Sequence, residues 1–142
     1  MRVQVSARVE YALRALTELA SEGRRLTAER ISAAEAIPIR FLLNILGELV
    51  HAGIVTSRRG SVGGYELARP ASQIRLADVV RAVEPDRARR GSRGAAPRSA
   101  LSAEAVRRFR AATVESFDAM LESTTVADLL AGAERRPAGR VG

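Results

Sequence analysis

The sequence contains no cysteine, no tryptophan and no lysine, and its one histidine is His51. Without cysteine the chain can form no disulfide framework, thiolate zinc finger or cysteine-ligated iron–sulfur cluster, and it has no cysteine nucleophile. A single histidine excludes a multi-histidine metal site within one chain. No apolar run approaches the ~20 residues that a membrane span needs, and the first residues lack the apolar core of a signal peptide. We therefore expect a cytoplasmic protein without a membrane partner, a metal or a cofactor.

The basic excess of the chain consists of arginine alone and is unevenly distributed. The 23 basic residues face 16 acidic ones, which gives a net charge of +7. Residues 1–84 carry +3, residues 85–98 carry +4, residues 99–134 carry −3 and the last eight residues carry +3. This balance favours an anionic partner, nucleic acid first, although a codon bias toward arginine would also explain the composition.

Composition divides the chain into four parts. Residues 1–84 and 102–131 have regular apolar spacing and are expected to fold. Residues 85–101, rich in Arg, Gly and Pro, are expected to form a linker or flexible loop, and residues 132–142 a disordered tail. The expected fold is mostly α-helical with one small β-hairpin.

Apolar residues of the first part recur with helical spacing. A first helix is predicted between its N-cap Ser6 and Gly23, and a short second helix follows Thr27. A third helix is predicted over residues 38–52, because a proline suits its first turn and an inward stripe follows at i, i+3, i+4 and i+7: Leu42, Ile45, Leu46 and Leu49. A fourth helix covers about residues 76–83.

Between the third and fourth helices the pattern becomes that of a hairpin. Residues 54–57 and 65–68 are short strand-like runs joined by a Gly-rich segment. Two short helices followed by a hairpin give the order of a winged helix–turn–helix. In that fold a helix enters the DNA major groove and the hairpin tip reaches a phosphate backbone or the minor groove.

Several side chains of this unit have the chemistry of DNA recognition. Asparagine can pair with adenine, and arginine can pair with guanine or phosphate. The outward positions near the start of the third helix include one residue of each type: they are Ile39, Arg40, Leu43 and Asn44. In the hairpin tip, Arg58 and Arg59 lie beside glycines, which let a guanidinium approach a narrow minor groove.

Each feature alone also has an ordinary structural explanation. A helix with outward arginine and asparagine is usually only solvated, and a Gly-rich tip is usually only a turn. Their order and spacing together favour DNA binding. His51 is interpreted as a surface or helix-terminus residue and Glu10 as a helix-surface carboxylate. The pair Gly63-Gly64 is not a phosphate-binding loop, because no Gly-Lys-Ser/Thr and no helix follow it.

Two other classes of function come into question besides DNA binding. The alternative is a protein-interaction module that regulates, or is regulated by, a partner protein. An enzyme is not expected, because no histidine base stands near a serine or aspartate and no paired carboxylates suggest a cleft.

The C-terminal part predicts one long amphipathic helix from residue 102. Its apolar positions form a single stripe over about six turns, with little of its own chain to cover it. A second copy of the helix is the economical partner. The expected dimer contacts are Val106, Phe109, Thr113, Phe117, Met120 and Leu121. Thr125 and Asp128 then form a capping-box-like start of a last short helix.

Three motifs carry a resemblance to a known family. They are Glu-Tyr-Ala-Leu-Arg-Ala-Leu at residues 10–16, Arg-Gly-x-x-Gly-Gly-Tyr-x-Leu-Ala-Arg-Pro at residues 59–70, and Thr-Thr-Val-Ala-Asp-Leu-Leu at residues 124–130. With them, the chain resembles the Rrf family of bacterial regulators (IscR, NsrR and CymR type) over about residues 2–84 and 103–131.

The resemblance implies a homodimeric, sequence-specific DNA-binding regulator, which we expect to be a nucleoid-associated repressor. Its long C-terminal helices would pair across a two-fold axis, and its recognition helices would enter successive major grooves of a pseudo-palindromic operator. The expected signal is a small molecule, a partner protein or DNA occupancy alone. The full set of expected DNA-binding positions is Thr27, Pro38, Ile39, Arg40, Leu43, Asn44, Arg58, Arg59, Ser61, Gly63, Gly64 and Tyr65.

The sequence also departs from the family pattern. Many members hold an iron–sulfur cluster on three cysteines after the fourth helix, and some add a carboxylate where Glu10 stands and a histidine where Arg14 stands. Here no cysteine is present, so we expect no cluster. Leu43 replaces a common acid, which predicts a different operator. Ala36 replaces a turn glycine and would cost about 1 kcal/mol in a left-handed conformation.

Overall fold

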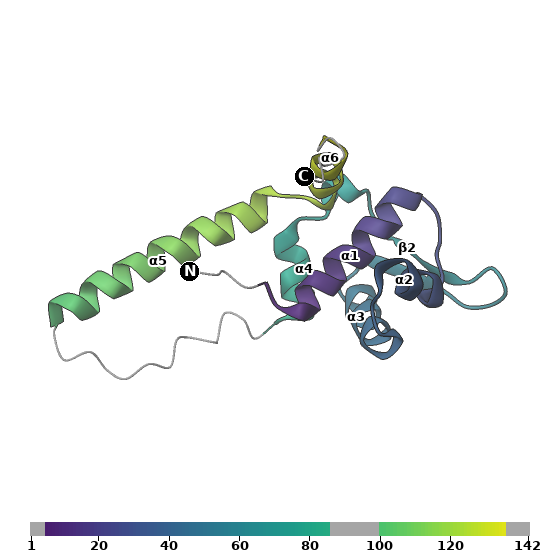
Figure 1. The fold of residues 1–142 in the computed structure, drawn as a ribbon, viewed down its shortest axis with the longest axis horizontal. Helices are drawn as coiled ribbons and strands as arrows, with labels where there is room; N and C mark the ends of the chain where they lie inside the picture. Colours follow the sequence, from purple (N-terminus) through teal and green to yellow (C-terminus); the bar gives the residue numbers. More distant parts are fainter. Residues whose placement is uncertain (1–4, 86–99, 136–142) are drawn as a thin grey trace, which may run out of the picture.

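The computed structural model describes residues 5–85 and 100–135. Its first part contains the helices α1 (Ala7–Glu22), α2 (Ala28–Glu35), α3 (Ile39–His51) and α4 (Leu76–Val83). The strands β1 (Val55–Arg58) and β2 (Gly64–Leu67) and the short 3-10 helix η1 (Ala71–Gln73) lie between α3 and α4. The helices α5 (Ala100–Ser123) and α6 (Val126–Arg135) follow, and α5 extends away from the rest of the molecule (Figure 1).

Local capping fixes the ends of the first two helices. The Ser6 hydroxyl accepts a hydrogen bond from the Val9 N–H at 3.2 Å, and the Thr27 hydroxyl accepts one from the Arg30 N–H at 3.2 Å. Gly23 ends α1 in the left-handed region with φ 61°, a conformation that glycine adopts without a Cβ penalty. The predicted N-cap Ser6 and the predicted helix end at Gly23 are therefore confirmed, and Thr27 caps the helix that was predicted to follow it.

The turn from α2 to α3 is strained at Ala36. Its φ is 51°, and it is the only non-glycine residue with positive φ in the described chain. Two hydrogen bonds close the turn around it: Ile37 N–H donates to the Ser32 carbonyl at 3.1 Å, and the Ser32 hydroxyl donates to the Ile37 carbonyl at 2.5 Å. Ala36 therefore has the left-handed conformation considered in the sequence analysis, and this conformation lowers the stability of the fold by about 1 kcal/mol for a non-glycine residue.

The hairpin differs by one residue at each strand from the predicted bounds. β1 and β2 pair antiparallel with Val55 opposite Leu67 and Arg58 opposite Gly64. A further extended residue joins them, because Leu26 and Tyr65 exchange two backbone hydrogen bonds, at 2.9 and 2.7 Å. The segment between α1 and α2 thus anchors the hairpin to the helices.

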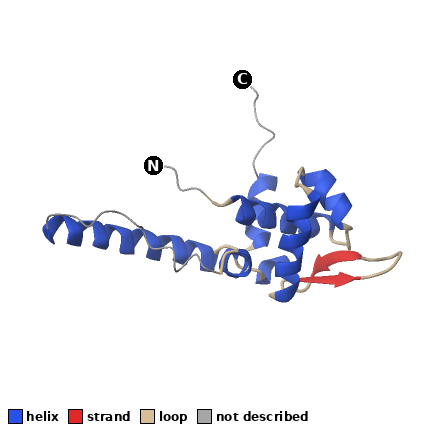
Figure 2. Cartoon of the chain, turned by 90° about the horizontal axis from the view of Figure 1, so that it is seen from below, coloured by secondary structure: helices blue, strands red, loops and turns tan. Residues whose placement is uncertain are grey.

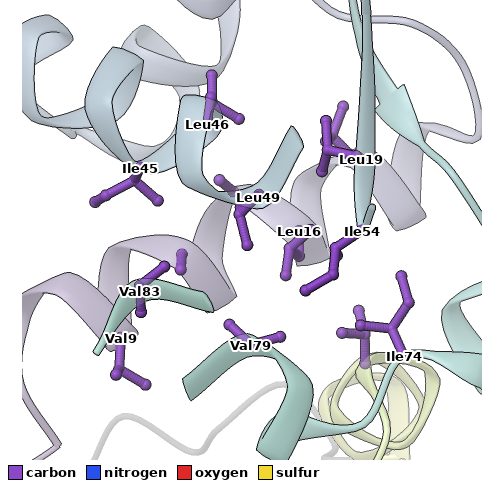
Figure 3. Packing of buried hydrophobic residues seen from close by; sticks show 14 of the residues in the cluster. Val9, Leu16, Leu19, Ile45, Leu46, Leu49, Ile54, Ile74, Val79 and Val83 are labelled. Carbon is purple, nitrogen blue, oxygen red and sulfur yellow. The ribbon is translucent and has the colours of Figure 1, made fainter. Parts of the chain in front are cut away.

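The core is entirely apolar among the described residues. Side chains from α1, α3 and α4 point toward one another, and Ile54 and Ile74 lie beside them, Ile74 close to α6 (Figure 3). The predicted inward stripe of α3 is fully buried: Leu42, Ile45, Leu46 and Leu49. Its opposite face is consequently left to solvent.

The base of α5 is fixed to this core. Leu76 N–H donates to the Thr124 carbonyl at 2.8 Å, and Val126 N–H donates to the Ile74 carbonyl at 2.9 Å. The two segments therefore pair as a short antiparallel bridge. The predicted capping box is confirmed, since Thr125 N–H donates to Asp128 Oδ2 at 2.9 Å and Asp128 N–H to Thr125 Oγ1 at 3.1 Å.

Two predicted segment boundaries were wrong. The long helix begins at Ala100, inside the segment expected to be a linker, and α6 continues to Arg135, inside the expected tail. Alanine, leucine, glutamate and arginine favour helix, which explains both extensions. The other residues of the expected linker and tail, 86–99 and 136–142, lie outside the residues that the structure describes. None of the described helices is long and apolar enough to cross a membrane.

Candidate nucleic-acid interface

The exposed face of α3 holds the residues predicted to read DNA. Arg40 and Asn44 are exposed, and neither side chain makes a hydrogen bond or ion pair within the described residues. Ile39 and Leu43 are exposed apolar side chains beside them. Pro38 precedes the helix and provides no side-chain cap, so the first N–H groups of α3 are not used by a capping side chain.

Sequence reasoning missed two exposed positions of the same helix. Phe41 is 55% exposed, although aromatic side chains are usually buried. Gly47 is the second, one turn beyond Asn44, and His51, which the sequence already placed at the surface, is exposed one turn later. The helical spacing from Arg40 and Asn44 predicts that Gly47 lies on the same face. Side-chain chemistry gives no such signal, because glycine has no side chain.

The hairpin tip forms a wing that projects beyond the helices (Figure 2). Arg58, Arg59 and Ser61 are exposed in it. The Gly63 N–H donates to the Gly60 carbonyl at 2.9 Å and closes the tip. The wing therefore presents its two arginines on a hydrogen-bonded turn.

Other predicted contact residues shape this unit. A Cβ at Gly63 would lie 2.5 Å from the Arg58 carbonyl oxygen, and one at Gly64 would lie 2.6 Å from that of Leu26. These glycines are thus required by the wing's own backbone. Tyr65 is half-buried against the core, and the exposed Thr27 caps α2.

The free positive charge of the described chain is concentrated on α3 and the wing. Ten arginines form ion pairs with described carboxylates: Arg8, Arg14, Arg24, Arg25, Arg30, Arg69, Arg75, Arg81, Arg107 and Arg108. Four with described side chains form none, and three of these are Arg40, Arg58 and Arg59; the fourth is Arg110 on α5. An unpaired guanidinium is available for a phosphate or a base edge.

The long helix α5 leaves most of its predicted stripe exposed. Val106, Phe109 and Met120 are about half exposed or more. Thr113 donates its hydroxyl to the Phe109 carbonyl at 2.8 Å, and Phe117 is partly buried against the core. Leu121, which the sequence assigned to the dimer contacts, is instead 8% exposed and belongs to the core of its own chain. Leu121 lies near the C-terminal end of α5, where this helix meets the core.

Comparison with known proteins places the chain among transcriptional regulators. The family model described as "Rrf2: Iron-dependent Transcriptional regulator" matches residues 5–132. The "Putative HTH-type transcriptional regulator Rv1287" of Mycobacterium tuberculosis is 38% identical over 139 residues, which cover 92% of this chain and 83% of that protein.

Solved structures agree with this relationship. T. potens IscR has a TM-score of 0.75 at 25% identity, with 96% of this chain and 94% of that chain covered. CymR of B. subtilis, described as its global cysteine regulator, has a TM-score of 0.72 at 26% identity, with 92% and 98% covered. The winged helix–turn–helix fold predicted from the sequence is thereby confirmed.

The iron named in the family description does not fit the donors of this chain. The sequence holds no cysteine and one histidine, and no group of three metal-ligating side chains gathers among the described residues. At the family's carboxylate position, Glu10 Oε1 lies 3.6 Å from the Arg14 guanidinium. Arg14 also bonds Glu35 of α2, so this position is occupied by an ion pair between helices.

Proposed function

The chain belongs to the Rrf2 family of transcriptional regulators, and on that premise we propose that it is a homodimeric repressor that binds operator DNA through α3 and the wing. The observation that carries the proposal is the placement of Arg40, Arg58 and Arg59. They are unpaired on the reading helix and the wing, whereas ten arginines elsewhere in the described chain are held by carboxylates. The protein is a regulator and not an enzyme.

The proposed reading uses both grooves. A helix with side chains is about 10–12 Å across and the major groove is about 12 Å wide, so α3 enters with Arg40 and Asn44 toward base edges or phosphates. Leu43 can offer only apolar contact, for instance to a thymine methyl. The uncapped N–H groups at the start of α3 suit a phosphate, and Arg59 reaches the minor groove from the wing.

The proposed dimer uses the exposed stripe of α5. Val106, Phe109 and Met120 leave apolar surface uncovered on one helix, which a second copy of the same stripe would bury. A two-fold dimer places its reading helices about 34–36 Å apart, one turn of DNA. Since the donors do not fit iron, the proposed signal is a small molecule or a partner protein.

Selection of duplexes from a random library tests the proposal. The selected sequences should be pseudo-palindromic, with half-sites about one helical turn apart. Arg40→Ala should weaken binding of a selected duplex by about 1–3 kcal/mol, roughly 5- to 150-fold. It should also lower the slope of log K against log salt by about 0.9 if the lost contact is a phosphate.

Arg108→Ala is the matched control. Arg108 lies on α5 with its side chain 81% exposed, and its removal should leave duplex binding unchanged. Equal losses from both substitutions would refute the assigned interface. Capture of acidic proteins, without retention of any duplex at moderate salt, would replace the proposal with a protein-interaction module.

A further inference from the structure

Gly47 lies in the interior of α3, and no described residue outside that helix explains why a glycine stands there. Apart from the backbone of its own helix, a Cβ built there meets no described atom within 4 Å, and its φ is outside the left-handed region. Glycine in a helix interior is less stable than alanine, because it loses more backbone freedom on folding. The sequence therefore keeps a destabilising residue where alanine would fit.

The other described glycines have a visible explanation. Gly23, Gly53, Gly60 and Gly64 have positive φ, and a Cβ at Gly63 would collide with backbone. Gly132 lies in the last turn of α6, where helices fray. Among the described glycines, Gly47 alone combines a central helical position with open space, which points to a need outside the chain.

Gly47 also lies in the middle of the proposed DNA-reading face. Asn44 is one turn before it and His51 one turn after it, and both are exposed. Beside it runs an open groove of about 500 Å³ between α3 and the end of α4. Leu43 and Asn44 form part of one wall, and Ala82 and Pro85 form part of the other.

We propose that Gly47 lets the DNA sugar–phosphate backbone pass close to α3, and that the DNA backbone lies in this groove. A helix about 10–12 Å across fills a major groove about 12 Å wide, so one missing side chain decides how closely the backbone can approach. Asn44 and His51 provide hydrogen-bond donors on either side. The inference rests on the proposed function and adds to it a residue that sets how deeply α3 enters the major groove.

The charges around the groove are compatible with this occupant. Glu48, the acidic residue of its wall, is paired with Arg8. Arg81, on the opposite wall, is held at 2.9 Å by both Asp78 and Glu122. Neither side presents an unpaired carboxylate to a phosphate, and recognition here depends on shape and on the hydrogen-bond donors of Asn44 and His51.

Gly47→Ala and Gly47→Leu test the inference, because both replacements favour helix. Each free protein should melt higher, by about 2–5 °C for alanine. The dissociation constant for a duplex selected from a random library by the unmodified chain should nevertheless rise, by about 10-fold for alanine and about 100-fold for leucine. Misfolding cannot produce a rise in both melting temperature and dissociation constant.

Gly132→Ala is the matched control, since it makes the same change in a helix remote from α3. It should leave duplex affinity unaltered. If both Gly47 variants bind as tightly as the unmodified chain while Arg40→Ala binds weakly, the inference is overturned and the proposed function stands. A lower melting temperature for Gly47→Ala would also overturn it, since that would reveal an internal need for the glycine. If the unmodified chain selects no duplex, the proposed function itself fails.

Discussion

The guanidinium of Arg25 lies 2.8 Å from the carboxylate of Glu66, joining the segment before α2 to the second strand of the wing. Arg25 also donates to the Val62 carbonyl at 3.2 Å, close to the wing tip. Together with the Leu26–Tyr65 backbone bonds, this pair fixes the direction in which the wing leaves the helices. The two proposed DNA-contacting elements are thus held in one geometry by a residue that need not touch DNA.

Arg25→Gln should loosen the wing without unfolding the protein. The ion pair is partly exposed, so its loss should cost no more than about 1 kcal/mol of stability. Amide hydrogen exchange at the wing tip should accelerate, and duplex affinity should fall several-fold. The neighbouring Arg24→Gln removes a comparable surface pair, to Glu22 at 3.0 Å, and should change neither quantity. Unaltered exchange in Arg25→Gln would show that the wing is held by its backbone bonds alone.

Arg59→Ala and Arg59→Lys should separate charge from groove fit. Alanine should reduce affinity by about 1–3 kcal/mol. Lysine retains the charge, but it lacks the planar fork of arginine. It should therefore keep the salt dependence while losing preference for sites with a narrow minor groove. Competition binding with selected duplexes and variants of their flanking A·T steps measures this preference. Identical preferences for arginine and lysine would contradict the minor-groove placement.

Ala36→Gly should stabilise the protein. The left-handed φ of 51° costs alanine up to about 1 kcal/mol that glycine does not bear. Ala33→Gly, at an exposed helical position of α2, should instead destabilise by about 0.5–1 kcal/mol. Urea unfolding of the two variants should shift the midpoint in opposite directions. A shift in the same direction would mean that the turn relaxes in solution.

Asp78→Asn should reveal a pH-dependent part of the stability. Burial alone would raise the pKa of Asp78, but hydrogen bonds from the Arg75 N–H and the Arg81 guanidinium, with Arg69 nearby, hold the pKa below its ordinary value of 3.8. A lowered folded pKa means that the charged form stabilises the fold above the ordinary pKa. This contribution is lost as the pH falls through the folded value. The difference in unfolding free energy between wild type and Asp78→Asn should be largest near neutral pH and shrink below about 4. A constant difference would exclude the charge as its cause.

Phe109→Glu should convert the proposed dimer to a monomer. Phe109 is 62% exposed on the α5 stripe, and burying a carboxylate against a second copy is costly. Light scattering should report a mass near 15.2 kDa in place of twice that value. Leu101→Glu provides the control, because Leu101 is 85% exposed but lies off the stripe by helical spacing. Persistence of the dimer in Phe109→Glu would place the interface elsewhere.

The features that the sequence predicts correctly depend on contacts between residues close together in the chain. The cap at Ser6 joins residues three apart, and the stripe of α3 follows from the helical period alone. The pair Arg25–Glu66 spans 41 residues, and nothing in its local pattern marks it. The same holds for Leu121, whose burial depends on where α5 meets α4. Gly63 and Gly64 stood in a recognised motif, but only the backbone geometry explains why they are glycine.

The bridge between residues 74–76 and 124–126 makes α5 a lever. With 24 residues, the helix is about 36 Å long at 1.5 Å per residue, and it is held to the core at one end only (Figure 1). A 10° tilt at that bridge would displace the far end by about 6 Å, close to two base-pair rises of DNA. In the proposed dimer, a small local movement at the bridge would therefore be enough to change the distance between the two wings.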